Sequence, residues 1–139
     1  MEISAALGAA RTYHQSVLTT LRRNGRPQLS NVVHTVDDGG VVRVSTTADR
    51  AKYANLRREP WAALKVDAGS FWSYAVLEGP VELSDVAAAP DDANVDELVD
   101  LYRALSGEHD DWDAYRAAMV AERRVVVRLR ANHAYGMLR

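Results

Sequence analysis

Residues 45–56 read STTADRAKYANL, a stretch that leaves a strand and starts a helix with Arg50 and Lys52 in its first turn. A helix N-terminus carries a partial positive charge and free backbone N–H groups, so acidic residues are favoured there and cations are not. The chain has two lysines and fifteen arginines, which sets Lys52 apart from the other basic residues. This arrangement predicts a site for an anion between the two cations.

The strands and helices around this stretch follow from periodicity and turn residues. The dipeptide Asn24-Gly25 predicts a tight hairpin between the first two strands, and the segment 37–40 turns the chain again. Before residue 49 we expect a helix and a meander of three antiparallel strands, at residues 2–14, 16–21, 28–36 and 41–46.

The remainder of the chain predicts three more strands and three more helices. Pro60 ends the helix that begins near Asp49, and Gly79-Pro80 inside a long strand is typical of a bulge or barrel corner. In the last strand Val125, Val127 and Leu129 are expected to face the core. The predicted strands lie at 61–67, 74–83 and 124–130, and the helices at 49–59, 95–105 and 112–119.

Length and composition exclude several classes of protein. A chain of 139 residues is expected to form one domain, residues 1–139, with a core that needs no disulfide or structural metal. Its 17 basic and 19 acidic residues give a charge of −2, so we expect neither nucleic acid nor an anionic membrane as a partner. Any anion must be bound by a local group of residues.

The absence of cysteine excludes thiol catalysis and cysteine-based metal sites. The four histidines are scattered without the spacing of metal ligands, so no metal site is expected. No apolar run approaches the roughly 18 residues of a membrane span. These features lead us to expect a soluble cytoplasmic protein. The six predicted strands, with helices at the ends and in one insertion, indicate a small curved barrel of the α+β class.

The order of these elements resembles the split-barrel flavin and deazaflavin proteins, the superfamily of the pyridoxine-phosphate oxidase-like enzymes. The resemblance rests on the first hairpin, on the strand that leads into Ser45, on the Arg/Lys-x-x-Asn-Leu segment and on a later glycine-containing strand: residues 17–27, 45–47, 50–64 and 77–81. It implies a six-stranded antiparallel split β-barrel of the FMN-binding type, with a few peripheral helices.

Within that superfamily, the small size and the 50–64 segment look most like the branch that uses coenzyme F420. This resemblance implies a homodimer with the cofactor in the groove between two barrels. It also implies hydride transfer between reduced F420 and a small organic acceptor such as an enone, quinone or tetrapyrrole. Two alternatives are an FMN-binding oxidoreductase of the same fold and a non-catalytic module that binds a flavin or tetrapyrrole.

Candidate cofactor-binding residues follow from the donors that a phosphate needs. Lys52 and Arg50 supply charge, and Ser45, Thr46 and Thr47 supply hydroxyl groups. The alternative is that Asp49 caps the helix and both cations are solvated.

Three further residues are candidates with competing interpretations. Asn55 lies three residues after Lys52 and so shares its helix face, but an asparagine there can equally fix the helix to the sheet. Ser30 and Asn31, on the second strand, are candidates to hydrogen-bond the pyrimidine edge of the ring.

No catalytic residue is assigned, because in hydride transfer the cofactor carries the demanding chemistry. His34 is more typical of a structural histidine than of a general acid. Phe71, Trp72 and Tyr74 either cover a bound ring or pack in the core or a dimer interface. Arg124, Arg128 and Arg130 project from one face of the last strand, toward a cofactor or simply into solvent.

Overall fold

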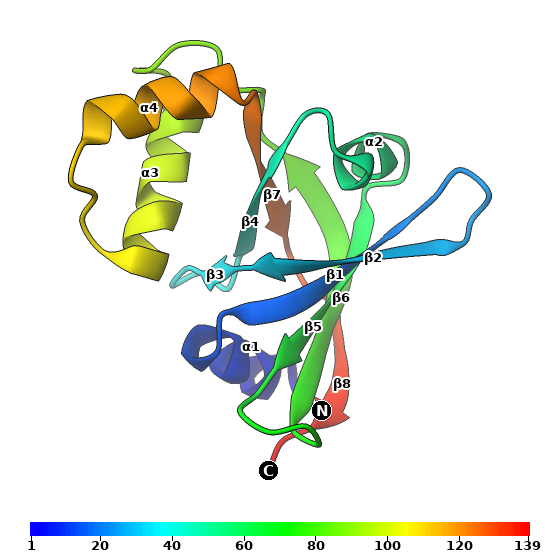
Figure 1. Ribbon diagram of the computed structural model, residues 1–139. Coiled ribbons are helices and arrows are strands. Elements are labelled where there is room, and N and C mark those ends of the chain that lie inside the picture. The colour runs from blue at the N-terminus through cyan, green and yellow to red at the C-terminus, as the bar shows by residue number, and fades with distance from the viewer.

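A curled antiparallel sheet of eight strands forms a half-barrel in the computed structural model, which describes residues 1–139 (Figure 1). Four helices accompany it, each beginning and ending within two residues of the predicted bounds. In chain order the elements are α1 (Ile3–Thr12), β1 (Gln15–Leu21), β2 (Pro27–Val33), β3 (Thr35–Val36), β4 (Val42–Thr47), α2 (Ala51–Arg58), β5 (Trp61–Asp67), β6 (Tyr74–Leu83), α3 (Ala93–Ser106), α4 (Trp112–Ala121), β7 (Arg124–Leu129) and β8 (His133–Met137).

The strand order is β2-β1-β5-β6-β7-β4-β3, with β8 paired to β6. The two end strands of this order, β2 and β3, are consecutive in the chain and are separated only by His34. One segment therefore supplies both ends of the sheet and curls it into the split barrel predicted from the sequence. All strand pairs are antiparallel.

The predicted number of six strands is wrong, and His34 explains part of the difference. The expected strand 28–36 is divided at His34, so that β2 pairs with β1 while β3 pairs with β4. The His34 ring is fully buried. Its Nδ1 lies 2.7 Å from Ser16 Oγ, and its Nε2 lies 2.9 Å from the carbonyl oxygen of Ala10. These bonds anchor the bend between the two strands.

The eighth strand, β8, was not predicted because its sequence lacks an apolar alternation. Only Ala134 of the segment HAYGM is buried. Its pairing with β6 brings Gly136 against the backbone of Tyr74, where an added Cβ would lie 2.4 Å from the Tyr74 carbonyl oxygen. The strand exists because of this partner, which is distant in sequence.

The corner predicted at Gly79-Pro80 is confirmed by the pairing of β6. Residues 74–80 of this strand pair with β5, whereas residues 81–83 pair with β7. The strand thus changes neighbours directly after Pro80, and the sheet bends there.

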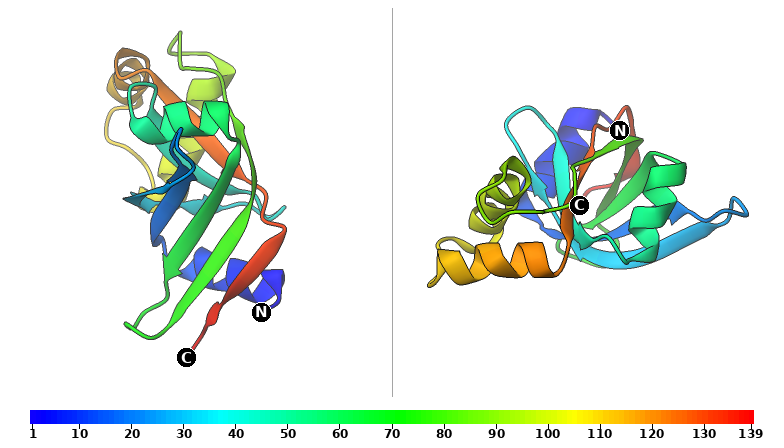
Figure 2. Two further views of the ribbon diagram at one scale, coloured as in Figure 1. Left: turned by 90° about the vertical axis from the view of Figure 1, so that its right-hand side faces the viewer. Right: turned by 90° about the horizontal axis from the view of Figure 1, so that it is seen from above.

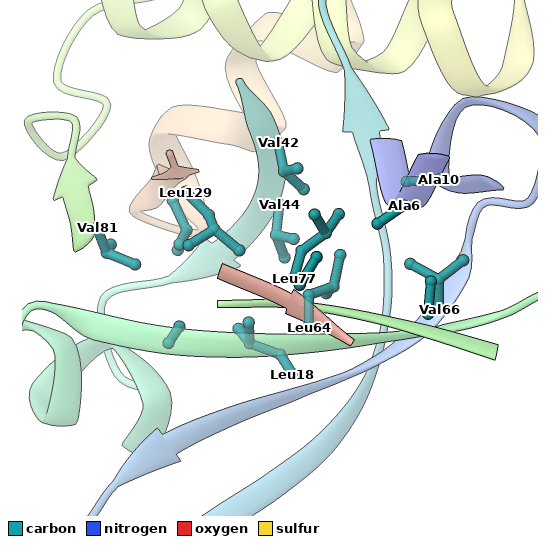
Figure 3. Packing of buried hydrophobic residues seen from close by; sticks show 14 of the residues in the cluster. Ala6, Ala10, Leu18, Val42, Val44, Leu64, Val66, Leu77, Val81 and Leu129 are labelled. Atoms are coloured by element: carbon teal, nitrogen blue, oxygen red, sulfur yellow. The ribbon is translucent and has the colours of Figure 1, made fainter. Parts of the chain in front are cut away.

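The main core fills the inside of the half-barrel (Figure 3). Leu18, Leu64, Leu77 and Leu129 are among its buried side chains, and α1 closes one end with Ala6 and Ala10. Apolar burial of this kind is the main favourable term in folding.

A second apolar cluster lies under α3 and α4, on the other side of β7. Val126 faces this cluster, while Val127 and Leu129 face the main core. Val125, Val127 and Leu129 are all buried, as predicted for a closing strand. The α3–α4 pair covers the β4–β7 part of the sheet (Figure 1).

No helix covers the outer face of β1, β5, β6 and β8, which lies toward the viewer in the left view of Figure 2 with α1 behind it. One cross-strand row on this face runs Leu29, Thr19, Ala63, Glu78, His133. None of the four helices is long and apolar enough to cross a membrane.

Candidate functional site

A pocket of about 470 Å³ opens where β2, β4, α2, α3 and β7 approach one another. Twelve residues line it, and seven of the eight predicted cofactor-binding residues are among them: Ser30, Asn31, Ser45, Thr46, Thr47, Arg50 and Lys52. The other lining residues are Val32, Val33, Leu101, Leu105 and Arg124. The fold thus brings together residues that are up to 94 positions apart, from Ser30 to Arg124.

Lys52 and Arg50 make no ion pair with any carboxylate of the chain. Burial lowers the pKa of Lys52, and repulsion by Arg50 and Arg124 lowers it further. The surroundings of Lys52 therefore disfavour the charged form of its side chain. An anion placed among these three cations would relieve that repulsion.

The start of α2 adds backbone donors to the same pocket. Arg50 is the N-cap residue, no side chain caps the helix, and its first turn contains no acidic residue. The first backbone N–H groups of a helix, here those of Ala51 and Lys52, have no partner inside the helix. Positive side chains and free N–H groups converge at this end, which suits an anion.

Asp49 does not cap α2, so that part of the alternative interpretation is wrong. Its carboxylate accepts a hydrogen bond from the Thr47 hydroxyl, and this bond lowers the pKa of Asp49. Thr47 is therefore already engaged by a neighbour, whereas Ser45 and Thr46 donate no hydrogen bond to a protein group.

Asn55 is the predicted site residue that does not line the pocket. Its side chain is buried, donates to Thr20 Oγ1 at 3.1 Å and to Gln28 Oε1 at 2.9 Å, and accepts from Arg58 at 3.2 Å. These bonds tie α2 to β1 and β2. The geometry matches the interpretation of Asn55 as the residue that fixes the helix to the sheet.

The β2 candidates lie at the meeting of two pockets. A second pocket, of about 410 Å³, shares Asn31, Val32 and Val33 with the first and extends to Gln15 and Asp67. Burial alternates along β2, so Ser30 and Asn31 point to opposite faces. An elongated ligand held by its anion in the first pocket would have room to continue along β2.

The predicted aromatic group lies outside these two pockets. Phe71 and Trp72 stack edge to face, with ring centroids 4.7 Å apart, and are 83% and 66% exposed. Nothing within the chain covers them. The other aromatic set, Tyr102, Trp112 and Tyr115, packs α3 against α4.

Of the three arginines in the predicted strand 124–130, Arg124 and Arg128 lie on β7, whereas Arg130 follows the strand and is exposed. Arg128 binds Glu97 on α3 and Glu82 on β6, and Glu97 also binds Arg43. Arg124 lines the pocket that contains Ser45, Arg50 and Lys52, which we call the anion pocket. Local sequence did not distinguish Arg124 from its neighbours, because only the pairing of β7 with β4 places it opposite Thr47.

Comparison with known proteins identifies a family. The sequence profile of the pyridoxamine 5'-phosphate oxidase family matches residues 5–138. Among solved structures, a conserved hypothetical protein from Mycobacterium tuberculosis is 21% identical to this chain, with a TM-score of 0.73. The match covers 96% of this chain and 82% of that protein's chain.

Two further solved structures are of proteins named for a cofactor. An F420 reductase is 25% identical with a TM-score of 0.67, covering 92% of this chain and 94% of its own. A pyridoxamine 5'-phosphate oxidase-related, FMN-binding protein from Nostoc punctiforme is 18% identical with a TM-score of 0.60, covering 95% of this chain and 80% of its own.

Proposed function

The chain belongs to the pyridoxamine 5'-phosphate oxidase family, and from this premise we propose that it is an oxidoreductase that binds coenzyme F420 and exchanges hydride with a small organic acceptor. The observation that carries the proposal is the cationic pocket: Lys52, Arg50, Ser45 and Thr46 converge with the free N-terminus of α2. Positive side chains, hydroxyl groups and free backbone N–H groups are the donors that suit a phosphate on a cofactor side chain.

F420 is preferred to FMN for two reasons. The 50–64 segment looks like that of the F420-dependent branch, and the F420 reductase is more similar to this chain than the FMN-binding protein is, at 25% against 18% identity. FMN remains the second candidate, because its phosphate would use the same donors.

The residues of this chain would bind, orient and shield the cofactor. When bound, the ring of the cofactor supplies the hydride chemistry. Lys52 and Arg50 would hold the phosphate, while Ser30, Asn31 and the β2 backbone would orient the ring. No side chain of the pocket needs to act as an acid or base in this scheme.

We further propose that the protein is a cytoplasmic homodimer built through the outer face of the sheet. Leu29 and Val33 on β2 are 62% and 52% exposed on this face, beside the pocket. Phe71 and Trp72 add exposed aromatic surface at the β5–β6 turn. Exposed large apolar side chains that gather on one face of a protein are typical of an interaction site.

Binding titrations test the proposed function. Wild-type protein should quench the fluorescence of F420 on titration, and Lys52→Ala should weaken binding about tenfold or more, since a charge-assisted bond to phosphate is lost. Arg57→Ala is the matched control. It removes one positive charge from the same helix at an exposed position outside the pocket, and should bind like wild type.

Three outcomes would contradict parts of the proposal. Absence of binding to both F420 and FMN would refute the function, and tighter binding of FMN would favour the second candidate. Equal affinity of Lys52→Ala and wild type would refute the site assignment even if the function stands.

A further inference from the structure

Arg124 stands at the first position of β7, opposite Thr47 in the register of β4 and β7. Its Nη1 donates to Ser45 Oγ at 3.4 Å, and its side chain is 29% exposed. Its Nε and Nη2 both donate to Oε1 of Glu122, at 3.1 and 2.8 Å. One edge of the guanidinium is thus held by a carboxylate, while Nη1 lies beside a hydroxyl of the anion pocket.

The turn between α4 and β7 fixes this arrangement. Arg123 has a φ of 53° and is the only non-glycine residue of the chain with a positive φ. Its carbonyl accepts a hydrogen bond from the Ala48 N–H at 3.0 Å, and its N–H donates to the Val120 carbonyl at 3.0 Å. The turn is therefore attached to the end of β4, and it places Glu122 and Arg124 on the same side of the chain.

We infer that Arg124 is a third cation of the phosphate site and that Glu122 is the positioning residue that aims it; this inference rests on the proposed function. A guanidinium has more N–H donors than the bonds to Glu122 and Ser45 use. Its planar fork also matches the oxygens of a phosphate ester better than an ammonium does. Lys52 on α2 and Arg50 at its N-cap then bind the phosphate from one side, and Arg124 on β7 binds it from the other.

An ordinary surface ion pair is the competing explanation for Arg124. A surface pair between Glu122 and Arg124 would affect neither ligand affinity nor the preference for phosphate. The two explanations differ in what happens when either residue is changed, because only a ligand contact depends on the phosphate group of the probe.

The test uses Arg124→Gln in the full chain, with FMN, F420 and riboflavin as probes. We expect the dissociation constants for FMN and F420 to rise about tenfold or more, and that for riboflavin, which lacks the phosphate, to stay unchanged. Arg116→Gln is the matched control, because Arg116 is paired with Asp96 and does not line the pocket. Arg124→Lys, which keeps the charge and loses the fork, should fall between wild type and Arg124→Gln.

Glu122→Gln tests the positioning role by the sign of its effect. If Glu122 only neutralises charge, removing it should strengthen anion binding. If it aims Arg124, its removal should weaken FMN and F420 binding, and Glu122→Gln should cause no further loss in the Arg124→Gln background.

The inference and the proposed function fail in different ways. Wild-type binding of FMN or F420 with no loss in Arg124→Gln and Arg124→Lys overturns the role of Arg124 alone. Tighter binding by Glu122→Gln overturns the positioning role. A wild-type protein that binds neither probe refutes the proposed function, and this inference with it.

Discussion

His34 shows how a single side chain shapes the sheet. Its ring is fully buried and its nitrogens bond Ser16 on β1 and the end of α1 at Ala10. If Nε2 carries the proton and donates to the carbonyl, Nδ1 accepts from the Ser16 hydroxyl, which is the arrangement of a neutral imidazole. Burial lowers the pKa of His34, and the nearby His14 lowers it further.

This depressed pKa predicts a loss of stability in mild acid. The unfolded chain takes up a proton on His34 near the ordinary pKa of 6.5, whereas the folded chain does so only at lower pH. The neutral ring therefore contributes its full share to the free energy of unfolding above pH 6.5. This contribution is lost as the pH falls toward the pKa of His34 in the folded chain. Urea unfolding between pH 7.5 and 5.5 should show this decline in wild type and a flatter profile in His34→Gln.

The exposed His133 provides the control for this titration. His133→Gln should keep the wild-type dependence on pH, because its side chain is 60% exposed. Parallel profiles for wild type and His34→Gln would show that another group is responsible.

For single residues, the sequence predicted which side chains lie together in the pocket, but not which contacts each of them makes. Lys52 and Arg50 were predicted from their unfavourable place in a helix, and they do share a pocket. The two interpretations of Asn55 could be separated only by seeing Thr20 and Gln28 beside it. Arg124 could not be predicted because its neighbourhood depends on pairing between strands 77 residues apart, Thr47 and Arg124.

At the scale of elements, the corner of β6 depends on the absence of a side chain at Gly79. An added Cβ would lie 2.6 Å from the Arg130 carbonyl oxygen and 2.9 Å from the Asn132 nitrogen. Both are backbone atoms of the segment between β7 and β8, so they cannot rotate away.

Gly79→Ala should therefore lower the free energy of unfolding by about 1–3 kcal/mol, through overpacking at the corner. Gly8→Ala is the opposite case: it lies inside α1 with no atom within 4 Å of its added Cβ. It should raise stability by about 0.5–1 kcal/mol, because alanine is the better helix former. Denaturant unfolding of both variants is the measurement, and equal effects of the two substitutions would contradict this account.

Elements with a strong local pattern were predicted well, and those that depend on distant partners were not. The alternation in β6 and β7 and the helical spacing of apolar residues in α3 and α4 were sufficient to place these elements. By contrast, β8 exists only against β6, and the break between β2 and β3 depends on bonds from His34 to α1 and β1. Local periodicity contains no information about either.

At the scale of the whole molecule, the sheet has one face that the chain does not cover. Cross-strand pairing aligns Asn31, Val17, Lys65, Val76 and Tyr135 in a row on that face. Tyr135 and Met137 of β8 are 46% and 47% exposed there. The exposed apolar side chains of this face are the part that a second copy would cover under the proposed dimer.

The anion pocket lies beside this uncovered face, because β2 contributes to both. Ser30, Asn31 and Val33 line the pocket, and Val33 also projects from the exposed side of the strand. If two copies pack through this face, the second copy would cover part of the groove along β2. Association and cofactor affinity should then be coupled.

Leu29→Asp tests this coupling. Leu29 is 62% exposed and does not line the anion pocket, so the substitution should leave the free energy of unfolding of the monomer almost unchanged. In a dimer it would bury a charge, a cost that should shift sedimentation from dimer to monomer and weaken F420 binding in parallel. Ala114→Asp adds the same charge on exposed α4, away from this face, and should alter neither property. A wild-type monomer that binds the cofactor fully would show that one chain forms the complete site.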